Sequence, residues 1–515
     1  MNTEDFIQRF RTFESSHSVE EFEAYGFQVW PVLRSWLGFQ LVFGLKAEGE
    51  RKPSGGGRFC RRFSAFLSMI GDSLRYRVLE HSSVPGLRGG DNSGAALDAV
   101  ILTDSNRCFV REGSLFHYIA DPVVRELERV GLKAEVWDLG KEGERHRLVE
   151  PVWLRRRFAA EIRRRLSLAR ISGEFSVWEK RAPAWFEPFG AWAGDLLGRP
   201  VKWEEVTARL RYVCLVARIF EEWLGKRRPR FLVVDCWYGL TTMGSILAAS
   251  RLGIYSLDIQ HGLQGNCDFA YSTWTKVPVG RYAALPDAFW VWGRENVRNV
   301  CQHNSPNFAG EGRAVVCGNL WINLCRYHAD GALQQEIQDL KRLTAGYSHV
   351  FLVTLQPSQG VEEAVWPAIQ NSPSDVFWFV RLHPRMNDLE KRRVEQMTQD
   401  MGERVNVSDA SRVSLYALLQ IVEIHLTGFS TCAHEALAFG KPTVLVHPSG
   451  LAFFREQVEQ GVMIFEPKRE EVCQAIEKAR TILPEACLEV GNGFFASEAE
   501  SLEGIRRMFR VESGD

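Results

Sequence analysis

Two histidines stand at the ends of apolar segments that lie 122 residues apart: His261 ends IYSLDIQH and His383 ends VFWFVRLH. An imidazole can accept a proton from a hydroxyl group or donate a hydrogen bond to a phosphate. In α/β proteins, ligands collect at the C-terminal ends of buried strands, where loops and helix N-termini converge. We therefore predict one site built from two domains, each of which contributes one histidine.

The segment around His383 carries groups suited to an anion. Arg381 offers a planar fork for phosphate oxygens, and His383 can donate one hydrogen bond. Pro384 then ends the strand, so that both side chains stay at its rim. These residues predict part of a nucleotide-binding site, although a strand-end Arg and His can also be solvated surface residues.

A second anion-binding pattern lies further along, in the segment LTGFSTCAHEALAFGKP. Gly428 allows a sharp turn after a strand, and Ser430 and Thr431 stand where the next helix is expected to begin, with free N–H groups that attract phosphate. Glu435, one turn later, can accept hydrogen bonds from a ribose diol. The alternative is that Ser430 only caps the helix and Glu435 pairs with a neighbouring base.

The first half of the chain offers three candidates for a catalytic base. His261 is one, and Asp235 and Asp104 follow the apolar segments FLVV and VILT. Gln260 is expected to orient its neighbour or the substrate, and Gly262 to allow close backbone approach. Each candidate can instead be structural, because an Asp after a strand often caps the next helix and an imidazole can bond a backbone carbonyl.

The composition limits the possibilities. A chain of 515 residues with 45% hydrophobic side chains can fill two cores. Its formal net charge of −1 argues against a nucleic-acid partner. The 11 cysteines form no C-x-x-C pair, which indicates reduced thiols in a cytoplasmic protein. No segment has the roughly 18 apolar residues of a membrane span, and the polar N-terminus does not resemble a secretory signal.

Two basic clusters stand out against this neutral balance. One surrounds a glycine-rich stretch at 51–62, and the other lies in a segment expected to be helical at 155–165. A positive charge near an anionic lipid surface contributes on the order of 1 kcal/mol. Either cluster can therefore hold the protein at a membrane; the alternative is a solvated helix face and a linker.

Strands and helices alternate in two successive series. In the first, DAVILTD, KAEVWDL, FLVVDCW and IYSLDIQ are expected strands, and a helix at 206–224 is expected to end at Gly225. In the second, HVFLVTLQ, FWFVRLHP, IVEIHLTG and PTVLVHP are expected strands. Such alternation gives parallel sheets. We predict the α/β GT-B architecture, in which two Rossmann-like domains face each other across a cleft, with an N-terminal helical segment.

The expected division of the chain has three parts. An N-terminal helical segment and linker cover 1–95. An acceptor domain covers 96–330, with a helical insert at 150–228, and a nucleotide-donor domain covers 331–515.

The QHG strand end, the RLHP strand end and the GFSTCAHEALAFGKP helix together resemble GT-B glycosyltransferases of bacterial surface polysaccharide assembly, including capsule, O-antigen and teichoic acid. They are most similar to capsule-type Kdo transferases and CDP-glycerol glycerophosphotransferases, and more distantly to bacterial sialyltransferases. The resemblance covers about 230–465. It implies a cytoplasmic enzyme, peripheral on the inner face of the membrane. Its partners would be a nucleotide-activated sugar and a glycan or lipid-linked glycan acceptor.

The resemblance also implies roles for the candidate bases. His261 corresponds to the H-G motif of the glycerophosphotransferases, whereas Asp235 or Asp104 would be the base in a layout like that of a Kdo transferase or a sialyltransferase.

The expected mechanism follows from charge, because negative charge grows on the leaving phosphate. The sequence has no D-x-D motif to hold a metal, so Arg381, His383 and the helix start at Ser430 are expected to neutralise that charge. We expect an inverting, metal-independent transferase without a cofactor, with a CMP- or CDP-linked donor. A glycerophosphotransferase, a non-hydrolysing sugar-nucleotide epimerase and an inactive binding module of a polysaccharide assembly complex remain alternatives.

Overall fold

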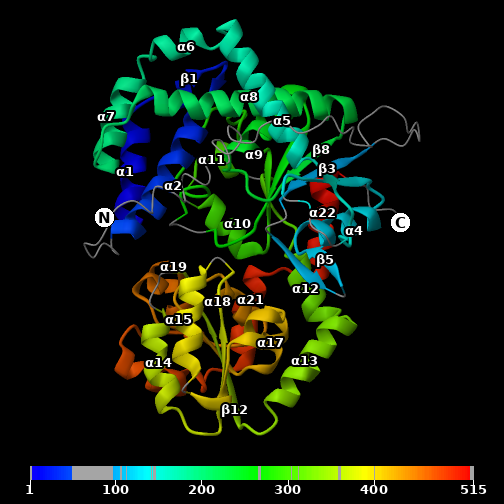
Figure 1. Cartoon of the computed structure of the whole chain (residues 1–515), viewed down its shortest axis with the longest axis vertical. Helices are drawn as coiled ribbons and strands as arrows, with labels where there is room; N and C mark the ends of the chain where they lie inside the picture. Colours follow the sequence, from blue (N-terminus) through cyan, green and yellow to red (C-terminus); the bar gives the residue numbers. More distant parts are fainter. Residues whose placement is uncertain are drawn as a thin grey trace. The chain divides into compact units, whose positions relative to one another are not determined.

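A computed structural model describes most of the chain in two compact units (Figure 1). Unit 1 comprises Met1–Trp290, Asn299–Val315 and Arg506–Asp515, and unit 2 comprises Val291–Arg298 and Val316–Ile505. The described residues are 3–48, 97–104, 107–111, 113–140, 142, 146–264, 268–302, 304–310, 312–357, 361–384, 386–399 and 401–510. The basic cluster at 51–62 and the linker expected around it lie outside them.

Unit 1 is built around a seven-stranded sheet in the order β11-β10-β9-β8-β3-β6-β7. Neighbouring strands from β7 to β10 pair in parallel. β3, β8 and β10 are buried along their whole length, as expected of a sheet covered on both faces. The strands are β3 (Ala99–Thr103), β6 (Ala134–Asp138), β7 (Val152–Trp153), β8 (Phe231–Val234), β9 (Tyr255–Ile259), β10 (Ala288–Val291) and β11 (Ala314–Val316).

The helices of unit 1 include a long central one, α8, which packs against α9. A Cβ at Gly244 would come within 2.6 Å of Val216, so this close approach requires glycine. The helices are α1 (Thr3–Ser16), α2 (Trp30–Glu48), α4 (Ala120–Arg129), α5 (Arg155–Ser172), α6 (Ser176–Lys180), α7 (Phe186–Leu197), α8 (Trp203–Arg227), α9 (Leu240–Leu252) and α11 (Pro306–Ala309). Two more, α10 (Arg294–Cys301) and α22 (Glu498–Phe509), contribute residues to both units.

The predicted end of α8 at Gly225 is wrong. The helix continues to Arg227, and the left-handed residue that ends it is Arg228, with φ of 49°. Gly225 therefore lies inside the last turn, where a glycine costs about 1 kcal/mol relative to alanine but does not by itself break a helix.

The N-terminal helices α1 and α2 belong to unit 1. Rings of α1 and α2 pack on α7: Phe13 stacks on Trp192 with ring centroids 4.1 Å apart, and Phe10 contacts the same indole edge-on at 5.2 Å. Trp30, at the start of α2, contacts Phe13 at 5.7 Å. Aromatic packing thus ties helices α1 and α2 to the sheet domain. A separate hairpin of β4 (Cys108–Arg111) and β5 (Ser114–His117) follows β3.

Unit 2 contains a six-stranded parallel sheet in the order β14-β13-β12-β15-β16-β17. Its strands are β12 (His349–Thr354), β13 (Val376–Arg381), β14 (Val405–Asn406), β15 (Ile424–Thr427), β16 (Thr443–Leu445) and β17 (Met463–Phe465). The helices around the sheet are α12 (Leu320–Tyr327), α13 (Gly331–Leu343), α14 (Val361–Asn371), α15 (Asp388–Gln399), α16 (Ser408–Arg412), α17 (Leu415–Ile421), α18 (Cys432–Ala438), α19 (Pro448–Glu459), α20 (Val472–Ala479) and α21 (Pro484–Phe494).

The two sheets share one strand order. In each, the first strand lies in the middle, the next two strands lie on one side, and the fourth and later strands lie on the other. This is the Rossmann-like order, so the predicted α/β fold with two parallel sheets is confirmed. Within the described residues, no helix is both long and apolar enough to span a membrane.

Candidate functional site

The strand order indicates where a ligand should bind in each unit. Open α/β sheets bind ligands beyond the C-terminal strand ends, at the switch point where the strand order reverses. In unit 2 the switch point lies between β12 and β15, whose last residues, Thr354 and Thr427, are paired. The backbone N–H of Phe429 donates to Oε1 of Gln356 at 2.9 Å, which joins the two loops that leave these strands.

A buried polar layer lies directly beneath this switch point. The Oγ1 of Thr354 is 2.8 Å from Nε2 of His425, and it donates to Oγ1 of Thr427 at 3.0 Å. The other ring nitrogen of His425 is 3.1 Å from Oγ1 of Thr443. Burial lowers the pKa of His425 to about 3, so the imidazole is neutral at physiological pH. The floor of the unit 2 switch point is therefore polar, uncharged and held by side-chain hydrogen bonds.

The turn from β15 into α18 contains Gly428, Ser430 and Thr431. The Oγ of Ser430 accepts from the N–H of Cys432 at 3.3 Å, so its hydroxyl does cap the helix start, although the residue at the N-cap position is Thr431. A Cβ at Gly450 would lie 2.6 Å from the carbonyl oxygen of Gly428, which brings the start of α19 against this turn. Two helix N-termini therefore flank the loop.

Glu435 lies in the first turn of α18 and is partly buried. Its Oε1 accepts a hydrogen bond from the Tyr416 hydroxyl at 2.7 Å. Burial raises the pKa of Glu435, and it raises the pKa of Tyr416 well above its ordinary value, so the phenol remains a donor. Tyr416 holds one carboxyl oxygen of Glu435 in place, which fixes the orientation of the other.

Arg381 is partly committed to the fold. Its Nη1 donates to the backbone carbonyls of Ala410 at 2.5 Å and Val413 at 2.7 Å. Burial lowers the pKa of this guanidinium, and nearby acidic side chains, including Glu435, oppose that effect. His383, two residues beyond the end of β13, is partly buried. The structure therefore keeps both residues at the strand rim, with one nitrogen of Arg381 used to hold α16.

The switch point of unit 1 lies between β3 and β8 and contains Asp235. This buried carboxylate accepts from Oγ1 of Thr103 at 3.1 Å and from Nε of Arg107 at 2.8 Å. Burial lowers the pKa of Arg107, but the charge of Asp235 and the contributions of Tyr118 and Cys236 together exceed that effect, so the pKa is raised. Asp235 is thus an ion-paired carboxylate.

His117 completes the unit 1 switch point. Its Nδ1 accepts from the N–H groups of Ile119 and Ala120 at 3.3 and 3.0 Å, so Nε2 carries the proton. Nε2 lies 3.2 Å from the backbone carbonyl of Asp104 and 2.6 Å from Oγ1 of Thr103. Burial, helped by the nearby Arg147 and Arg107, lowers the pKa of His117 to about 3. This neutral ring fixes the backbone at Asp104, whose side chain is partly buried.

His261 stands beyond the neighbouring strand, β9. Its Nε2 is 3.0 Å from the Tyr238 hydroxyl. Burial raises the pKa of Tyr238 well above its ordinary value, so the phenol can donate to a neutral imidazole and accept from a protonated one. The side chain of Gln260 donates to the carbonyl of Gly262 at 3.0 Å, which closes the turn that carries His261.

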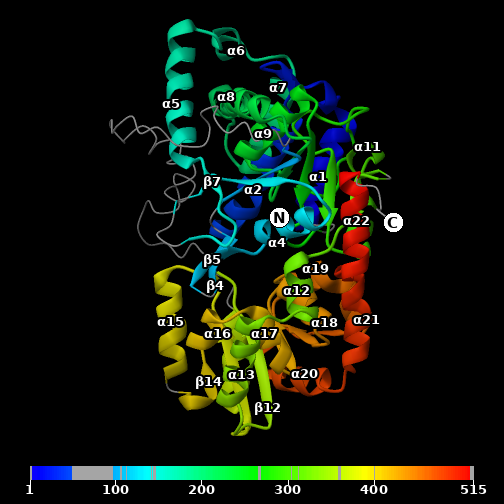
Figure 2. The same cartoon turned by 90° about the vertical axis from the view of Figure 1, so that its right-hand side faces the viewer.

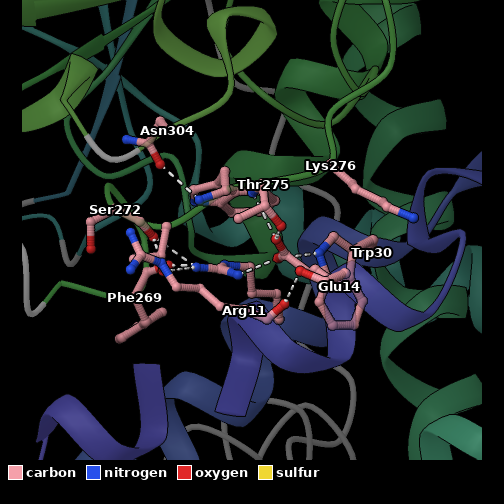
Figure 3. Close-up of polar contacts among 12 residues, drawn as sticks. Arg11, Glu14, Trp30, Phe269, Ser272, Thr275, Lys276 and Asn304 are labelled. Atoms are coloured by element: carbon pink, nitrogen blue, oxygen red, sulfur yellow. Dashed lines mark hydrogen bonds and ion pairs between the residues drawn. The ribbon is translucent and has the colours of Figure 1, made fainter. Parts of the chain in front are cut away.

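A buried ion pair anchors the segment that follows this turn (Figure 3). Glu14 of α1 is paired with Arg34 of α2, and both side chains are excluded from solvent. Oε2 of Glu14 accepts from the backbone N–H and the hydroxyl of Thr275 at 2.7 and 2.5 Å, while Trp30 donates to Oε1 at 2.9 Å. Nη2 of Arg34 donates to the carbonyl of Ser272 at 2.7 Å. The N-terminal helices therefore fix the course of the chain after His261.

The same helices also approach the His261 turn through aromatic contacts. Phe39 of α2 lies 5.6 Å from the Tyr238 ring and 5.3 Å from the Phe269 ring. At Gly38 the Phe269 ring occupies the space of a Cβ, 2.3 Å away. Tyr238, which bonds His261, is thus packed against the N-terminal segment.

The structure gathers the predicted residues into groups. Asp104 and Asp235 follow the neighbouring strands β3 and β8 at the switch point of unit 1, and Gly428, Ser430, Thr431 and Glu435 share one turn and helix start in unit 2. The hydrogen-bond partners of the predicted residues were not predicted. Three of these partners, Arg107, Tyr238 and Gln356, follow strand ends closely, so their position in the sequence could have identified them. Tyr416, which bonds Glu435, gave no sequence signal. Among the described residues, no cluster of three or more His, Cys, Asp and Glu side chains suits a metal ion.

Comparison with solved structures finds proteins of similar layout. The S. aureus protein MnaA in complex with UDP is 13% identical, with a TM-score of 0.48, over 81% of this chain and 99% of its own. The UDP-GlcNAc 2-epimerase from Neisseria meningitidis, bound to UDP-GlcNAc, is 12% identical, with a TM-score of 0.47, over 81% and 100%. The calicheamicin glycosyltransferase CalG4 is 13% identical, with a TM-score of 0.43, over 81% and 100%. No family model matches the sequence, and no curated protein does.

Proposed function

We propose that this chain is an inverting, metal-independent glycosyltransferase of the GT-B type, which uses a CMP- or CDP-linked donor to extend a cell-surface polysaccharide or a lipid-linked glycan. The observation that carries the proposal is the Rossmann-like strand order of unit 2, because Gly428, Ser430 and Thr431 follow the strand at which that order reverses. Nucleotides bind at this point in sheets of this order. The nucleotide sugar is the substrate, and the proposal needs no cofactor.

The proposed donor site uses the chemistry of that loop. Backbone N–H groups at the turn after β15 and the Thr431 hydroxyl bind the phosphates, with His383 and the remaining nitrogens of Arg381 as further donors. The second carboxyl oxygen of Glu435, whose first is held by Tyr416, accepts from a ribose hydroxyl. The uncharged floor formed around His425 supports this role, since it brings no negative charge toward the phosphates.

The proposed reaction is a single displacement. The acceptor hydroxyl attacks the anomeric carbon and gives its proton to the imidazole of His261, while the bond to the phosphate oxygen breaks and its electron pair leaves with the nucleotide. Tyr238 supports this choice of base, because its hydroxyl can donate to the neutral ring and accept from the protonated one. The ion pair of Asp235 with Arg107 favours His261 over Asp235. Asp104 remains the alternative base.

The proposed enzyme works in the cytoplasm at the inner face of the membrane, where a lipid-linked acceptor would be available. The basic residues of α5 support a peripheral contact with anionic lipid headgroups.

A thermal-shift panel of CMP, CDP, UDP and GDP, each with and without EDTA, tests the donor site. A ligand that binds only the folded protein raises its unfolding temperature. We expect CMP or CDP to give the largest shift, unchanged by EDTA, and we expect Thr431→Val to reduce it. The proposal would be overturned if the stabilisation required a divalent metal, or if none of the four nucleotides stabilised the protein.

Donor turnover tests the chemistry. Transfer from a CMP- or CDP-linked donor to a lipid-linked glycan should fall about 100-fold or more in His261→Asn, with little change in nucleotide affinity. Release of glycerol phosphate from CDP-glycerol would instead identify a glycerophosphotransferase. Conversion of free UDP-sugar without an acceptor would identify an epimerase, and nucleotide binding without turnover of any donor would identify a binding module.

A further inference from the structure

Helices α5 and α6 lie at one edge of unit 1 (Figure 2) and carry exposed aliphatic side chains. Leu168 is 51% exposed, Ile171 is 85% exposed and Val177, in α6, is 73% exposed. Cationic side chains surround these three aliphatic ones. The α5–α6 surface consists of Arg155, Arg156, Arg163, Arg164, Leu168, Arg170, Ile171 and Val177.

Helical periodicity explains why the aliphatic residues of α5 on this surface are exposed. Helix α5 buries Phe158, Ile162 and Ala169, which packs that side of the helix onto the rest of unit 1. At about 100° per residue, the opposite side carries Arg164, with Leu168 four and Ile171 seven positions further on. Arg164, Leu168 and Ile171 therefore form a stripe on the exposed side of α5, and Arg156, Arg163 and Arg170 lie beside it.

The charge of the surface is strongly positive. Residues 155–181 contain nine basic and three acidic residues, a formal charge of +6 in a chain whose total is −1. All three acidic side chains are paired with arginine: Glu161 with Arg164 and Arg165, Glu174 with Arg218, and Glu179 with Arg211. Within the described part of the chain, four arginines of the surface enter no ion pair: Arg155, Arg156, Arg163 and Arg170.

We propose that the α5–α6 surface docks this protein onto an anionic lipid bilayer. Leu168, Ile171 and Val177 enter the headgroup region, and the arginines beside them bind lipid phosphates. This combination favours a membrane over a nucleic acid, because a nucleic-acid surface gains from stacked aromatic rings and phosphate contacts but gains little from exposed aliphatic side chains. The inference assigns to one surface the membrane contact included in the proposed function.

Co-sedimentation of the full chain with vesicles tests the proposal. We compare phosphatidylcholine vesicles with vesicles that also contain phosphatidylglycerol, and we expect binding only to the second kind. The triple variant Arg156→Gln/Arg170→Gln/Ile171→Ser should lower the partition coefficient by about 25-fold or more, since each basic residue contributes about fivefold. All three side chains are exposed, so the unfolding temperature of the variant should match the wild type.

A matched variant on unit 2 provides the control. Leu389 of α15 is 72% exposed, and Arg392, three residues later, is exposed as well. The variant Leu389→Ser/Arg392→Gln should bind vesicles within twofold of the wild type. Equal vesicle binding by the α5 variant and the wild type would overturn the proposal, as would no binding of the wild type to anionic vesicles.

Binding of single-stranded RNA is a second measurement that can overturn the proposal. If the α5 variant loses RNA binding while the wild type ignores vesicles, the surface is a nucleic-acid site and the proposal is wrong. None of these measurements uses a nucleotide donor. Vesicle binding that depends on α5 would therefore stand even if no nucleotide stabilised the protein, and a nucleotide-binding chain that ignored vesicles would leave only the catalytic proposal standing.

Discussion

The switch points of the two units share a framework. In each, the first strand of the sheet ends in a threonine whose hydroxyl meets Nε2 of a buried histidine. Thr103 and His117 are 2.6 Å apart in unit 1, and Thr354 and His425 are 2.8 Å apart in unit 2. The pKa of each histidine is lowered to about 3, mainly by burial. A neutral histidine thus holds the threonine at the strand end by a hydrogen bond in both units.

The two switch points differ in the residue that the threonine hydroxyl bonds on the other side of the switch point. The hydroxyl of Thr103 reaches the carboxylate of Asp235, whereas that of Thr354 reaches the hydroxyl of Thr427. A charge buried beside a strand end needs a partner, and Arg107 supplies it in unit 1. Among the described residues of unit 2, no such ion pair lies at the layer of Thr354 and Thr427. One framework therefore gives a self-neutralised switch point in unit 1 and an uncharged one in unit 2, where an anionic ligand would meet no fixed carboxylate in the floor.

Removing the carboxylate of unit 1 should have the largest effect. Asp235→Ala leaves the guanidinium of Arg107 without its partner in a largely buried position, and we expect the free energy of unfolding to fall by about 3 kcal/mol. Asp235→Asn, which keeps a hydrogen-bond acceptor for Thr103, should cost less. Urea unfolding measures both. Equal losses for Asp235→Ala and Thr427→Val would contradict the contrast between the switch points.

Acid should weaken both units through their histidines. The folded-state pKa of His117 and of His425 is about 3, below the ordinary value of 6.5. The stability that depends on the neutral rings is therefore complete above pH 6.5 and is lost as pH falls toward 3, because only the unfolded chain takes up the protons. Between pH 7 and pH 5 we expect each histidine to cost about 2 kcal/mol.

The variants His117→Asn and His425→Asn separate the contribution of each unit. Each should flatten the pH dependence of the free energy of unfolding between pH 7 and pH 5, measured by urea unfolding, whatever its effect at pH 7. An unchanged slope in either variant would show that the ring in question is not a buried neutral group.

Nucleotide affinity should respond to unit 2 alone. Glu435→Gln removes the charge of the oxygen proposed to accept from ribose, and we expect about a tenfold loss of affinity, close to 1.4 kcal/mol. Asp235→Asn should leave the affinity within twofold. Isothermal titration with CMP or CDP measures both, and the opposite ranking would assign the nucleotide to unit 1.

Removing the hydroxyl of Thr427 should have the smallest effect on the free energy of unfolding. Thr427→Val removes the acceptor for Thr354, which still has Nε2 of His425 as a partner, so the free energy of unfolding should fall by about 1 kcal/mol. Thr103→Val should cost more, because Thr103 donates to a carboxylate. Equal costs in the urea titration would mean that the charge of Asp235 adds nothing to the framework.

The strands were predictable where burial is continuous. The segments FLVVDCW and FWFVRLHP correspond to β8 and β13, because strands covered on both faces read as unbroken apolar runs. The edge strand Val152–Trp153 was missed, since it has two partly buried residues and no period to recognise. Strand ends could be located for the same reason as the strands, so the positions of Asp235 and His261 at sheet edges were predictable from the sequence.

The hydrogen-bond partners of Asp235 and His261 could not be predicted from the sequence. Arg107 lies 128 residues from Asp235, and Tyr238 lies 23 residues from His261. Such pairings depend on which strands become neighbours and on how far each loop extends. The local conformational preferences of the residues determine neither. The order of strands in the sheet decides that a residue after β3 can reach one after β8.

The ion pair of Glu14 and Arg34 has a consequence for the order of events during synthesis. The hydrogen-bond partners of Arg34 among residues 272–275 follow it in the sequence by as many as 239 residues. At about 5–20 residues per second, a ribosome needs roughly 12 to 48 seconds to add them. Throughout that interval the pair lacks the backbone and hydroxyl partners that residues 272–275 supply. Burial of this pair therefore marks a late point in the assembly of unit 1, and a nascent chain released before it would leave two opposite charges and the surrounding aromatic rings in water.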